Sequence, residues 1–100
     1  METKNQPKLS IILPCLNEEL SIEKCISDIN NELQGKIDFE IIVVDNNSSD
    51  QSENILKKIK ETDPNIKVYL EKIIGYGSAC ARGFKEASGE YLLLMDMDQT

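Results

Sequence analysis

Histidine is absent from the 100-residue chain, and cysteine occurs only three times. Cys15, Cys25 and Cys80 are odd in number, and no two of them have the spacing of metal ligands. Without histidine they do not form a usual set of zinc ligands, so we expect no zinc site. Each cysteine is instead predicted to be a small buried hydrophobic side chain in a reduced protein.

Basic residues and long apolar runs are also scarce. The chain has 11 Lys and Arg against 18 Asp and Glu, a net charge of −7, so it lacks the basic face of a nucleic-acid-binding protein. No apolar run approaches the length of a membrane span. Residues 1–8 form a polar tail without the apolar core of a signal peptide, which predicts a cytoplasmic protein without a nucleic-acid partner.

Four short apolar runs stand out in the remaining residues, and we expect each to be a strand. They cover residues 9–13, where Pro14 is expected to end the strand, and residues 38–45, 66–70 and 91–95. Near-continuous apolar runs of this length are typical of strands covered on both faces, as in a parallel sheet.

Three helical patterns separate these runs. The first is an apolar stripe at Ile22, Ile26, Ile29 and Leu33, with Asn17 as the predicted N-cap and Gly35 at the end. The second begins where Asp50 and Glu53 resemble a capping box and stops before Pro64. The third lies between the turn at residues 75–77 and Gly89, with a predicted buried stripe at Cys80, Phe84 and Ala87.

The alternation of strands and helices predicts an α/β fold with an open, mostly parallel sheet. Right-handed crossovers favour the strand order 3-2-1-4. In such sheets ligands bind beyond the carboxyl ends of the strands, where the winding reverses. Three polar clusters should meet at that edge: residues 14–19, 45–50 and 96–98.

Asp96 and Asp98 would both repel a diphosphate unless a cation lay between them. Mg²⁺ or Mn²⁺ prefers oxygen ligands and is commonly shared between carboxylates and phosphates, so the pair predicts a metal and diphosphate site. A solvated strand end is the alternative for an isolated pair. The carboxylate of Asp45 can accept hydrogen bonds from a base or ribose, whereas Asn46–Ser49 fit a turn.

Other polar residues leave their alternatives open. Glu18 suits either ribose binding or the first turn of a helix, where a carboxylate complements the dipole. The turn at residues 75–79 opens a helix, so its amides suit either an anion or close packing. For Arg82 and Lys85 we favour a solvated helix face over phosphate contact.

These pieces together resemble the family 2 glycosyltransferases, which have the Rossmann-like GT-A fold. The similarity runs from about Leu9 to the end of the chain and comprises residues 10–19, 42–50, 75–79, 83–84, 87–91 and 96–98. Within the family, the Gly-Tyr-Gly-Ser-Ala turn at residues 75–79 is most similar to the polyprenyl-phosphate sugar transferases, of the dolichol-phosphate mannosyltransferase type.

The resemblance implies a site for a nucleotide sugar. It assigns Asp45 to the base and Asp96 and Asp98 to Mg²⁺ or Mn²⁺, and the whole set is Pro14, Leu16, Asn17, Glu18, Val44, Asp45, Asp96, Met97 and Asp98. Two positions depart from the family pattern. Asn46 stands where a second acidic residue is usual, and Met97 stands where alanine is common.

The reaction implied for a complete enzyme is transfer of a hexose from a UDP- or GDP-sugar to a polyprenyl or dolichyl phosphate with inversion, at the cytosolic face of a membrane. Residues 9–100 would be the donor-binding part, with the catalytic base expected beyond Thr100. We expect this segment to be inactive alone. An uncovered fourth strand would favour self-association.

Three other interpretations use the same residues. Residues 96–100 match the Asp-x-Asp-x-Thr signature of haloacid-dehalogenase-like phosphatases, with Asp96 as nucleophile and Asp98 as acid or base. A dinucleotide-dependent oxidoreductase is less favoured, because this chain lacks the glycine-rich turn that such enzymes have after the first strand. A non-catalytic nucleotide-binding module stays open.

Overall fold

The structure, a computed structural model, describes residues 6–97. Strands and helices alternate along the chain, as the apolar runs predict. The elements are β1 (Leu9–Cys15), α1 (Ile22–Leu33), β2 (Phe39–Asp45), α2 (Ser52–Thr62), β3 (Ile66–Leu70), α3 (Tyr76–Glu86) and β4 (Tyr91–Leu94).

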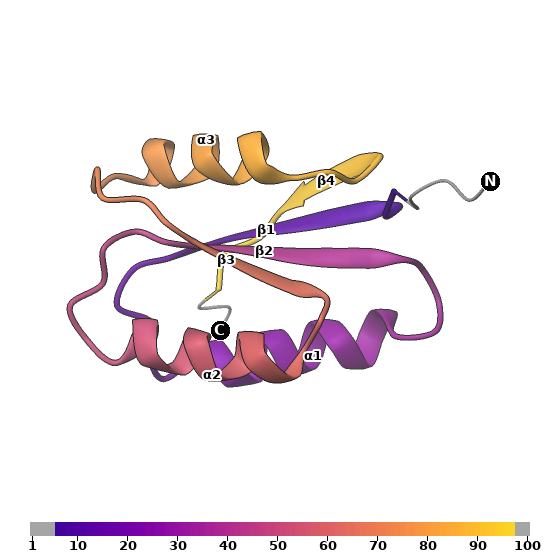
Figure 1. Ribbon diagram of the computed structural model, residues 1–100, viewed down its shortest axis with the longest axis horizontal. Helices are drawn as coiled ribbons and strands as arrows, with labels where there is room; N and C mark the ends of the chain where they lie inside the picture. The colour runs from indigo at the N-terminus through magenta and orange to yellow at the C-terminus, as the bar shows by residue number, and fades with distance from the viewer. Residues whose placement is uncertain (1–5, 98–100) are drawn as a thin grey trace.

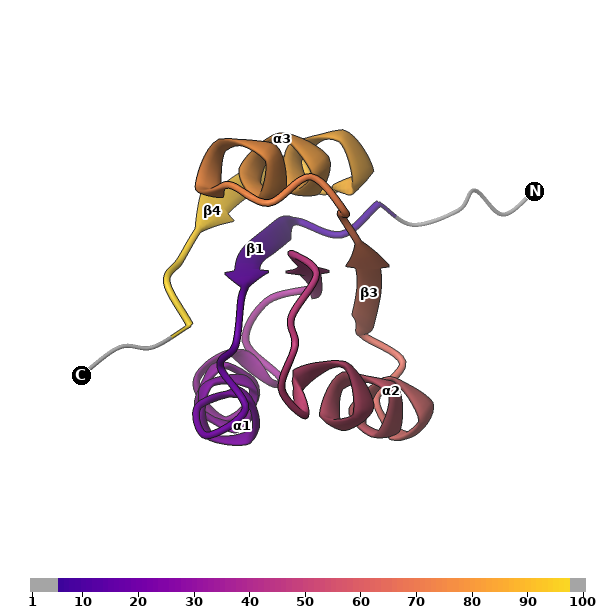
Figure 2. The ribbon, with the colours of Figure 1, turned by 90° about the vertical axis from the view of Figure 1, so that its left-hand side faces the viewer.

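The four strands form one parallel sheet in the order β3-β2-β1-β4, which confirms the predicted topology. Helices α1 and α2 cover one face of the sheet and α3 covers the other (Figures 1 and 2). The winding therefore reverses at β1, which pairs with β2 on one edge and with β4 on the other. This reversal is the switch point at which a ligand is expected.

The core has two layers because successive strand residues point to opposite faces. On the α1–α2 face, odd-numbered residues of β1 and β2 such as Ile11 and Val43 pack with the predicted stripe of α1. On the α3 face, Ile12, Ile42 and Val44 pack with Ala79. Burial of these side chains on both faces explains why the first two runs are almost continuously apolar.

Strand β1 continues through Pro14 to Cys15, so the prediction that Pro14 ends the strand is wrong. In a parallel strand the backbone groups of alternate residues point to the same neighbour. Ile12 O accepts Met95 N from the β4 side, so the nitrogen of Pro14 faces that side too. Because β4 pairs with β1 only as far as Ile12, Pro14 removes no bond from the ladder.

Both predicted N-caps are wrong. Ser21 is at the N-cap of α1 and Gln51 at that of α2, and neither makes a side-chain capping bond. Asn17 binds backbone groups of the other loop instead. Asp50 does both, since Oδ2 accepts Glu19 N of the other loop and Oδ1 accepts Ser52 N at the start of α2 at 2.9 Å. The end of α1 is as predicted, since Gly35 follows it with a φ of 80°, where glycine is favoured.

Helix α3 packs on the sheet through small residues rather than through the predicted stripe. Cys80 is buried, but Phe84 is 45 % exposed, so that part of the prediction is wrong. Ala79 and Gly83 form the contact. A Cβ atom at Gly83 would lie 2.4 Å from Cγ2 of Ile12, so the glycine sets how closely α3 approaches β1.

Strand β4 departs from the expectation of a strand covered on both faces. Its four side chains, Tyr91 to Leu94, are 36–59 % exposed, and within residues 6–97 its one partner is β1. An exposed apolar edge strand is a surface on which another strand can add. Self-association through this strand stays a prediction.

At the end of the sheet where β1 and β2 begin, the buried carboxylate of Glu40 joins several segments of the chain. It accepts hydrogen bonds from Ser10 Oγ at 2.6 Å and from the backbone and hydroxyl of Ser88 at 2.8 and 2.9 Å, and it pairs with Lys67 Nζ. Burial acts to raise the pKa of Glu40, but the bonds from Lys67, Ser10 and Ser88 outweigh it and lower the pKa to about 2.

We predict opposite effects for two alanine substitutions in α3. Gly83→Ala should lower the free energy of unfolding by about 1–3 kcal/mol, because the clash with Ile12 exceeds the gain in helix propensity. Gly77→Ala, whose Cβ meets nothing within 4 Å, should raise it by up to about 1 kcal/mol. Urea unfolding of both variants checks this, and stabilisation by Gly83→Ala would contradict the close packing.

The lowered pKa of Glu40 predicts a pH-dependent loss of stability. Its contribution is complete above pH 4.5, the ordinary pKa, and should disappear as the pH falls towards about 2. Glu40→Gln should cost about 3 kcal/mol at pH 7 and flatten the pH dependence in that window. Urea unfolding between pH 7 and pH 2.5 tests this, with Glu53→Gln as a control that changes stability by less than about 1 kcal/mol.

Candidate functional site

The site begins with two loops that are joined side by side at the carboxyl ends of β1 and β2. Asn17, whose φ is 54°, directs its side-chain oxygen at the second loop. That oxygen accepts Ser49 N at 2.8 Å and Asp50 N at 3.3 Å. Asparagine tolerates this left-handed backbone better than most residues, which explains the residue type at this position.

The second loop binds the first in return. Ser48 Oγ accepts Asn17 N at 2.9 Å, Ser52 Oγ accepts Glu18 N at 3.0 Å, and Asp50 Oδ2 accepts Glu19 N at 3.2 Å. These bonds satisfy consecutive backbone N–H groups before α1. The loop that carries Glu18 is therefore held in one conformation by polar residues of the other loop.

A cavity of about 190 Å³ lies at the switch point, next to these loops. Five of the residues predicted for the site line it: Pro14, Leu16, Glu18, Asp96 and Met97. Four other residues complete the lining, namely Cys15, Asn46, Tyr76 and Ala79. We call it the switch-point cavity. The sequence prediction that the first and third polar clusters meet is confirmed for these residues.

Asn46 fixes the wall of this cavity on the α3 side. Its Nδ2 donates to Glu71 O and Ile73 O at 3.0 and 2.9 Å, and its Oδ1 accepts Gly75 N at 2.9 Å. The side chain is buried and orders the whole connection from β3 to α3. A carboxylate could not donate the first two bonds, which gives a physical reason for asparagine at this departure from the family pattern.

Asp96 reaches the switch-point cavity from the end of β4. Tyr76 Oη, at the first turn of α3, lies 3.5 Å from Asp96 Oδ1. The pKa of Tyr76 is raised, mainly by its hydrogen bond with the Cys80 side chain, then by burial and by the charge of Asp96. The phenol therefore keeps its proton and can donate it to the carboxylate.

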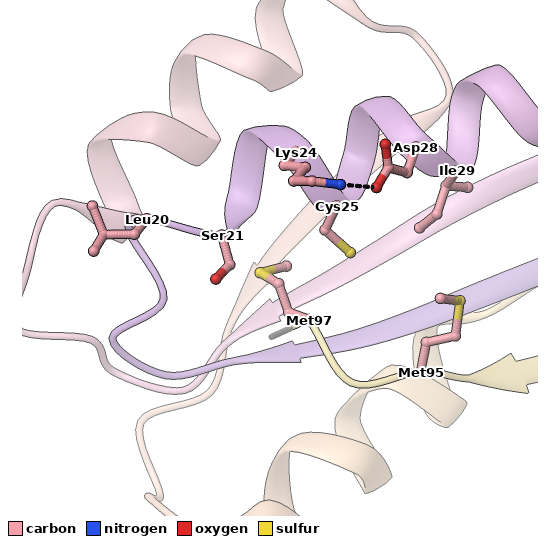
Figure 3. A pocket seen from close by; sticks show the side chains of 8 residues that line it. All are labelled: Leu20, Ser21, Lys24, Cys25, Asp28, Ile29, Met95 and Met97. Carbon is pink, nitrogen blue, oxygen red and sulfur yellow. Dashed lines mark hydrogen bonds and ion pairs between the residues drawn. The ribbon is translucent and has the colours of Figure 1, made fainter. Parts of the chain in front are cut away.

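Met97 anchors the segment that carries Asp96. Its side chain is 3 % exposed and belongs to the core on the α1–α2 face. Figure 3 shows it pointing towards Cys25 of α1; both side chains line a second cavity of about 130 Å³, which we call the α1 cavity. A methionine at this position thus adds a hydrophobic anchor next to Asp96, and both residues line the switch-point cavity.

Asp45 lies apart from the switch-point cavity. Its side chain is buried at the end of β2, and Oδ1 accepts Ser48 N at 3.1 Å. It lines a cavity of about 170 Å³ between β3 and α2, the α2 cavity, together with Glu53, Lys57, Lys60, Val68, Tyr69 and Leu70. The site therefore has two compartments at neighbouring strand ends.

Four other predictions have mixed outcomes. Val44 is fully buried in the α3-side core and lines neither compartment. Asp98 lies outside the described residues. Arg82 is not on a solvated face, because Nη1 donates to Leu70 O at 3.0 Å and the guanidinium stacks 5.3 Å from the centre of the Tyr69 ring. All three cysteines are buried and free, as expected.

The chemistry of the switch-point cavity suits a hard cation. Its carboxylates come from Glu18 and Asp96, and oxygen donors are the ligands that Mg²⁺ and Mn²⁺ prefer. Burial raises the pKa of the Cys15 thiol to about 12, although the hydrogen bond with Ser52 acts in the opposite direction. The thiol therefore stays protonated and does not compete with the carboxylates for a cation. Within residues 6–97 no three His, Cys, Asp or Glu side chains form a complete metal cluster.

Comparison with known proteins decides the family. The model of glycosyl transferase family 2 matches residues 10–100, nearly the whole chain. The chain belongs to glycosyltransferase family 2. Membership accounts for all three polar clusters, whereas the phosphatase signature accounts for residues 96–100 alone.

Two curated members of family 2 illustrate the similarity. The dolichol-phosphate mannosyltransferase of Pyrococcus furiosus is 40% identical over 91 residues, which are 91% of this chain and 26% of that enzyme. A Campylobacter jejuni GalNAc(5)-diNAcBac-PP-undecaprenol beta-1,3-glucosyltransferase is 37% identical over 94 residues, 92% of this chain and 30% of that enzyme. The chain thus spans about a quarter to a third of these family 2 relatives.

Solved structures of glycosyltransferases share the fold. The mannosyltransferase PcManGT of Pyrobaculum calidifontis, in complex with GDP-Man and Mn²⁺, has a TM-score of 0.82 at 26% identity, over 94% of this chain and 28% of its own. S. aureus TarS in complex with UDP has a TM-score of 0.80 at 32% identity, over 91% and 27%. The sheet and helices described above are therefore the GT-A arrangement of this family.

No helix among residues 6–97 is both long and apolar enough to cross a membrane.

Proposed function

We propose that residues 9–100 bind a nucleotide-diphosphate sugar, a UDP- or GDP-hexose, together with Mg²⁺ or Mn²⁺, as the donor-binding part of an inverting hexosyltransferase. The observation that carries this proposal is the pair of compartments at neighbouring strand ends. The buried Asp45 carboxylate lines one, and Glu18 and Asp96 line the other. This division matches a base at one end of the ligand and a diphosphate at the other.

The diphosphate needs positive charge in the switch-point cavity, because two carboxylates line it. Asp96 and Glu18 would hold a divalent cation, with Asp98 as a further ligand, and the bound cation neutralises the charge that develops on the leaving diphosphate. The first turn of α3 lines the same cavity through Tyr76 and Ala79. The positive end of the helix dipole there favours a phosphate group.

The base is assigned to the α2 cavity. There the Asp45 carboxylate accepts a ring N–H, and Pro14 and Leu16 pack against the ribose between the compartments. The bonds between the two loops hold these groups in place before the ligand arrives, which lowers the entropic cost of binding.

The acceptor class rests on the family relatives. Dolichol-phosphate mannosyltransferase and an undecaprenyl-phosphate 4-deoxy-4-formamido-L-arabinose transferase are among the similar proteins. We therefore propose a polyprenyl or dolichyl phosphate as the acceptor of the complete enzyme, used at the cytosolic face of a membrane.

Titration calorimetry with UDP and GDP tests donor binding. With Mn²⁺ present, we expect Asp96→Asn to weaken binding of the preferred nucleotide about tenfold or more, by loss of a metal ligand. Asp45→Ala should weaken binding about tenfold with or without the metal, because a charged hydrogen-bond acceptor is lost. Asp38→Asn, at the opposite end of the sheet, is the matched control.

Two outcomes would contradict the proposal. One is the lack of measurable binding of either nucleotide at millimolar concentration with Mn²⁺. The other is binding that neither Asp45→Ala nor Asp96→Asn changes. Release of phosphate from a generic phosphoester, abolished by Asp96→Asn, would support the phosphatase interpretation instead.

A further inference from the structure

The connection from β3 to α3, residues 71–75, determines where the first turn of α3 lies. It carries the chain past the carboxyl ends of the strands to the α3 side of the sheet (Figures 1 and 2). Among residues 6–97 no side chain caps α3, whose N-cap is Gly75 with a φ of 148°. Local capping therefore does not fix the start of this helix, and other contacts must do so.

Bonds from the end of β2 and from Glu71 hold the inner side of the connection. Asn46 binds three of its backbone groups. Glu71 N donates to Asp45 O at 2.9 Å, and Glu71 Oε2 accepts Ile73 N at 3.1 Å. These bonds order the connection and join it to β2, but none of them reaches α3 beyond its N-cap.

Arg82 supplies the link to α3. Its Nη1 donates to Leu70 O at 3.0 Å and lies 3.7 Å from Glu71 Oε1, while Nε donates to Glu86 Oε2 at 2.9 Å. The guanidinium also stacks over the ring of Tyr69. The side chains of Arg82 and Glu71 are 29 % and 19 % exposed, so solvent screens this ion pair less than it screens a pair on the surface.

Arg82 thus closes a ring that runs from Leu70 through the connection and the first two turns of α3. A shift of the first turn relative to β3 would break the contacts of Arg82 with Leu70 and Glu71. Arg82 is not among the residues that line the switch-point cavity or the α2 cavity, and its guanidinium already has three acceptors. An indirect role therefore suits it better than direct contact with a phosphate.

We propose that Arg82 is a positioning residue for the donor diphosphate, acting through Leu70 and Glu71 on the first turn of α3. The inference rests on the proposed donor-binding function, in which Tyr76 and Ala79 of that turn line the switch-point cavity. Backbone N–H groups at a helix start bind an anion in a direction set by the turn. A turn that is held in place before the ligand arrives binds it at a lower entropic cost.

Titration calorimetry of the full chain with UDP, GDP and their nucleosides, at fixed Mn²⁺, tests this role. Arg82→Met keeps an unbranched apolar side chain for the Tyr69 ring but loses both contacts with Leu70 and Glu71. It should weaken binding of the preferred diphosphate about tenfold and leave the affinity for its nucleoside unchanged. Lys85→Met removes the same charge from an exposed position of α3, so this matched control should change neither affinity.

Two further variants test the path of the effect. Arg82→Lys keeps the charge and a donor without the planar fork, so it should recover part of the loss. Glu71→Gln should weaken diphosphate binding about threefold, and this effect should largely disappear in the Arg82→Met background, because both residues act through one contact. If Arg82 instead touched a phosphate, Glu71→Gln would leave binding unchanged or strengthen it. Arg82→Lys and Glu71→Gln carry the test alone if Arg82→Met does not fold.

Hydrogen exchange of the ligand-free chain gives a second readout. The amides of Ile73 and Gly75, which donate to Glu71 and Asn46, should exchange faster in Arg82→Met than in the unsubstituted chain. The amides of Ile42 and Val43, in the middle of β2, should keep their rates. Uniformly faster exchange would indicate general destabilisation and would contradict a local role.

Failure of this inference is distinguishable from failure of the proposed function. Diphosphate binding that Arg82→Met weakens no more than Lys85→Met does, or a loss that the nucleoside shares equally, would overturn the positioning role and leave donor binding standing. Lack of measurable binding of UDP and GDP to the unsubstituted chain, at millimolar concentration with Mn²⁺, would overturn the donor-binding function and the inference with it.

Discussion

The parallel pairing of β1 on both edges is the constraint on which the rest of the structure depends. Since β2 and β4 flank β1, the connections on its two sides cover opposite faces of the sheet. After Cys15 the chain leaves the sheet between the segments that follow β2 and β4, and these two segments diverge there. The switch-point cavity forms in that space, with Pro14 placed where β4 no longer needs a hydrogen-bond donor.

Most polar residues near the site form hydrogen bonds with backbone groups, and these bonds fix the walls of the cavities. Asn17, Ser48 and Ser52 join two loops, Asn46 holds the connection to α3, and Met97 ties the end of the β4 segment to α1. Asp45, which is buried, and Asp96, which is exposed, each line one of these cavities. A rigid surround of this kind is what allows a few charged groups to bind a diphosphate selectively.

The strands, their order and the meeting of Glu18 with Asp96 could be predicted from sequence, because apolar runs and right-handed crossovers determine them. The bonds by which Asn17 and Asp50 join the two loops could not, since they connect residues more than 30 positions apart, whereas local patterns reveal only short-range bonds such as that from Ser52 N to Asp50. Gly83 was missed because a stripe pattern counts apolar side chains and not close approach. Lys57 and Lys60 resemble any solvated helix face until β3 and Asp45 are placed beside them.

Nuclear magnetic resonance titration of the ¹⁵N-labelled chain with UDP and a divalent cation tests donor binding most directly. With Mg²⁺, the amide signals of Cys15–Glu18, Asn46, Tyr76–Ala79 and Lys57–Lys60 should shift, and replacement by Mn²⁺ should broaden those nearest Asp96. Signals at the other end of the sheet, such as Gly35 and Asn65, should stay unchanged. Shifts confined to that end or to the α1 cavity, or a complete lack of shifts, would contradict a nucleotide site at the switch point.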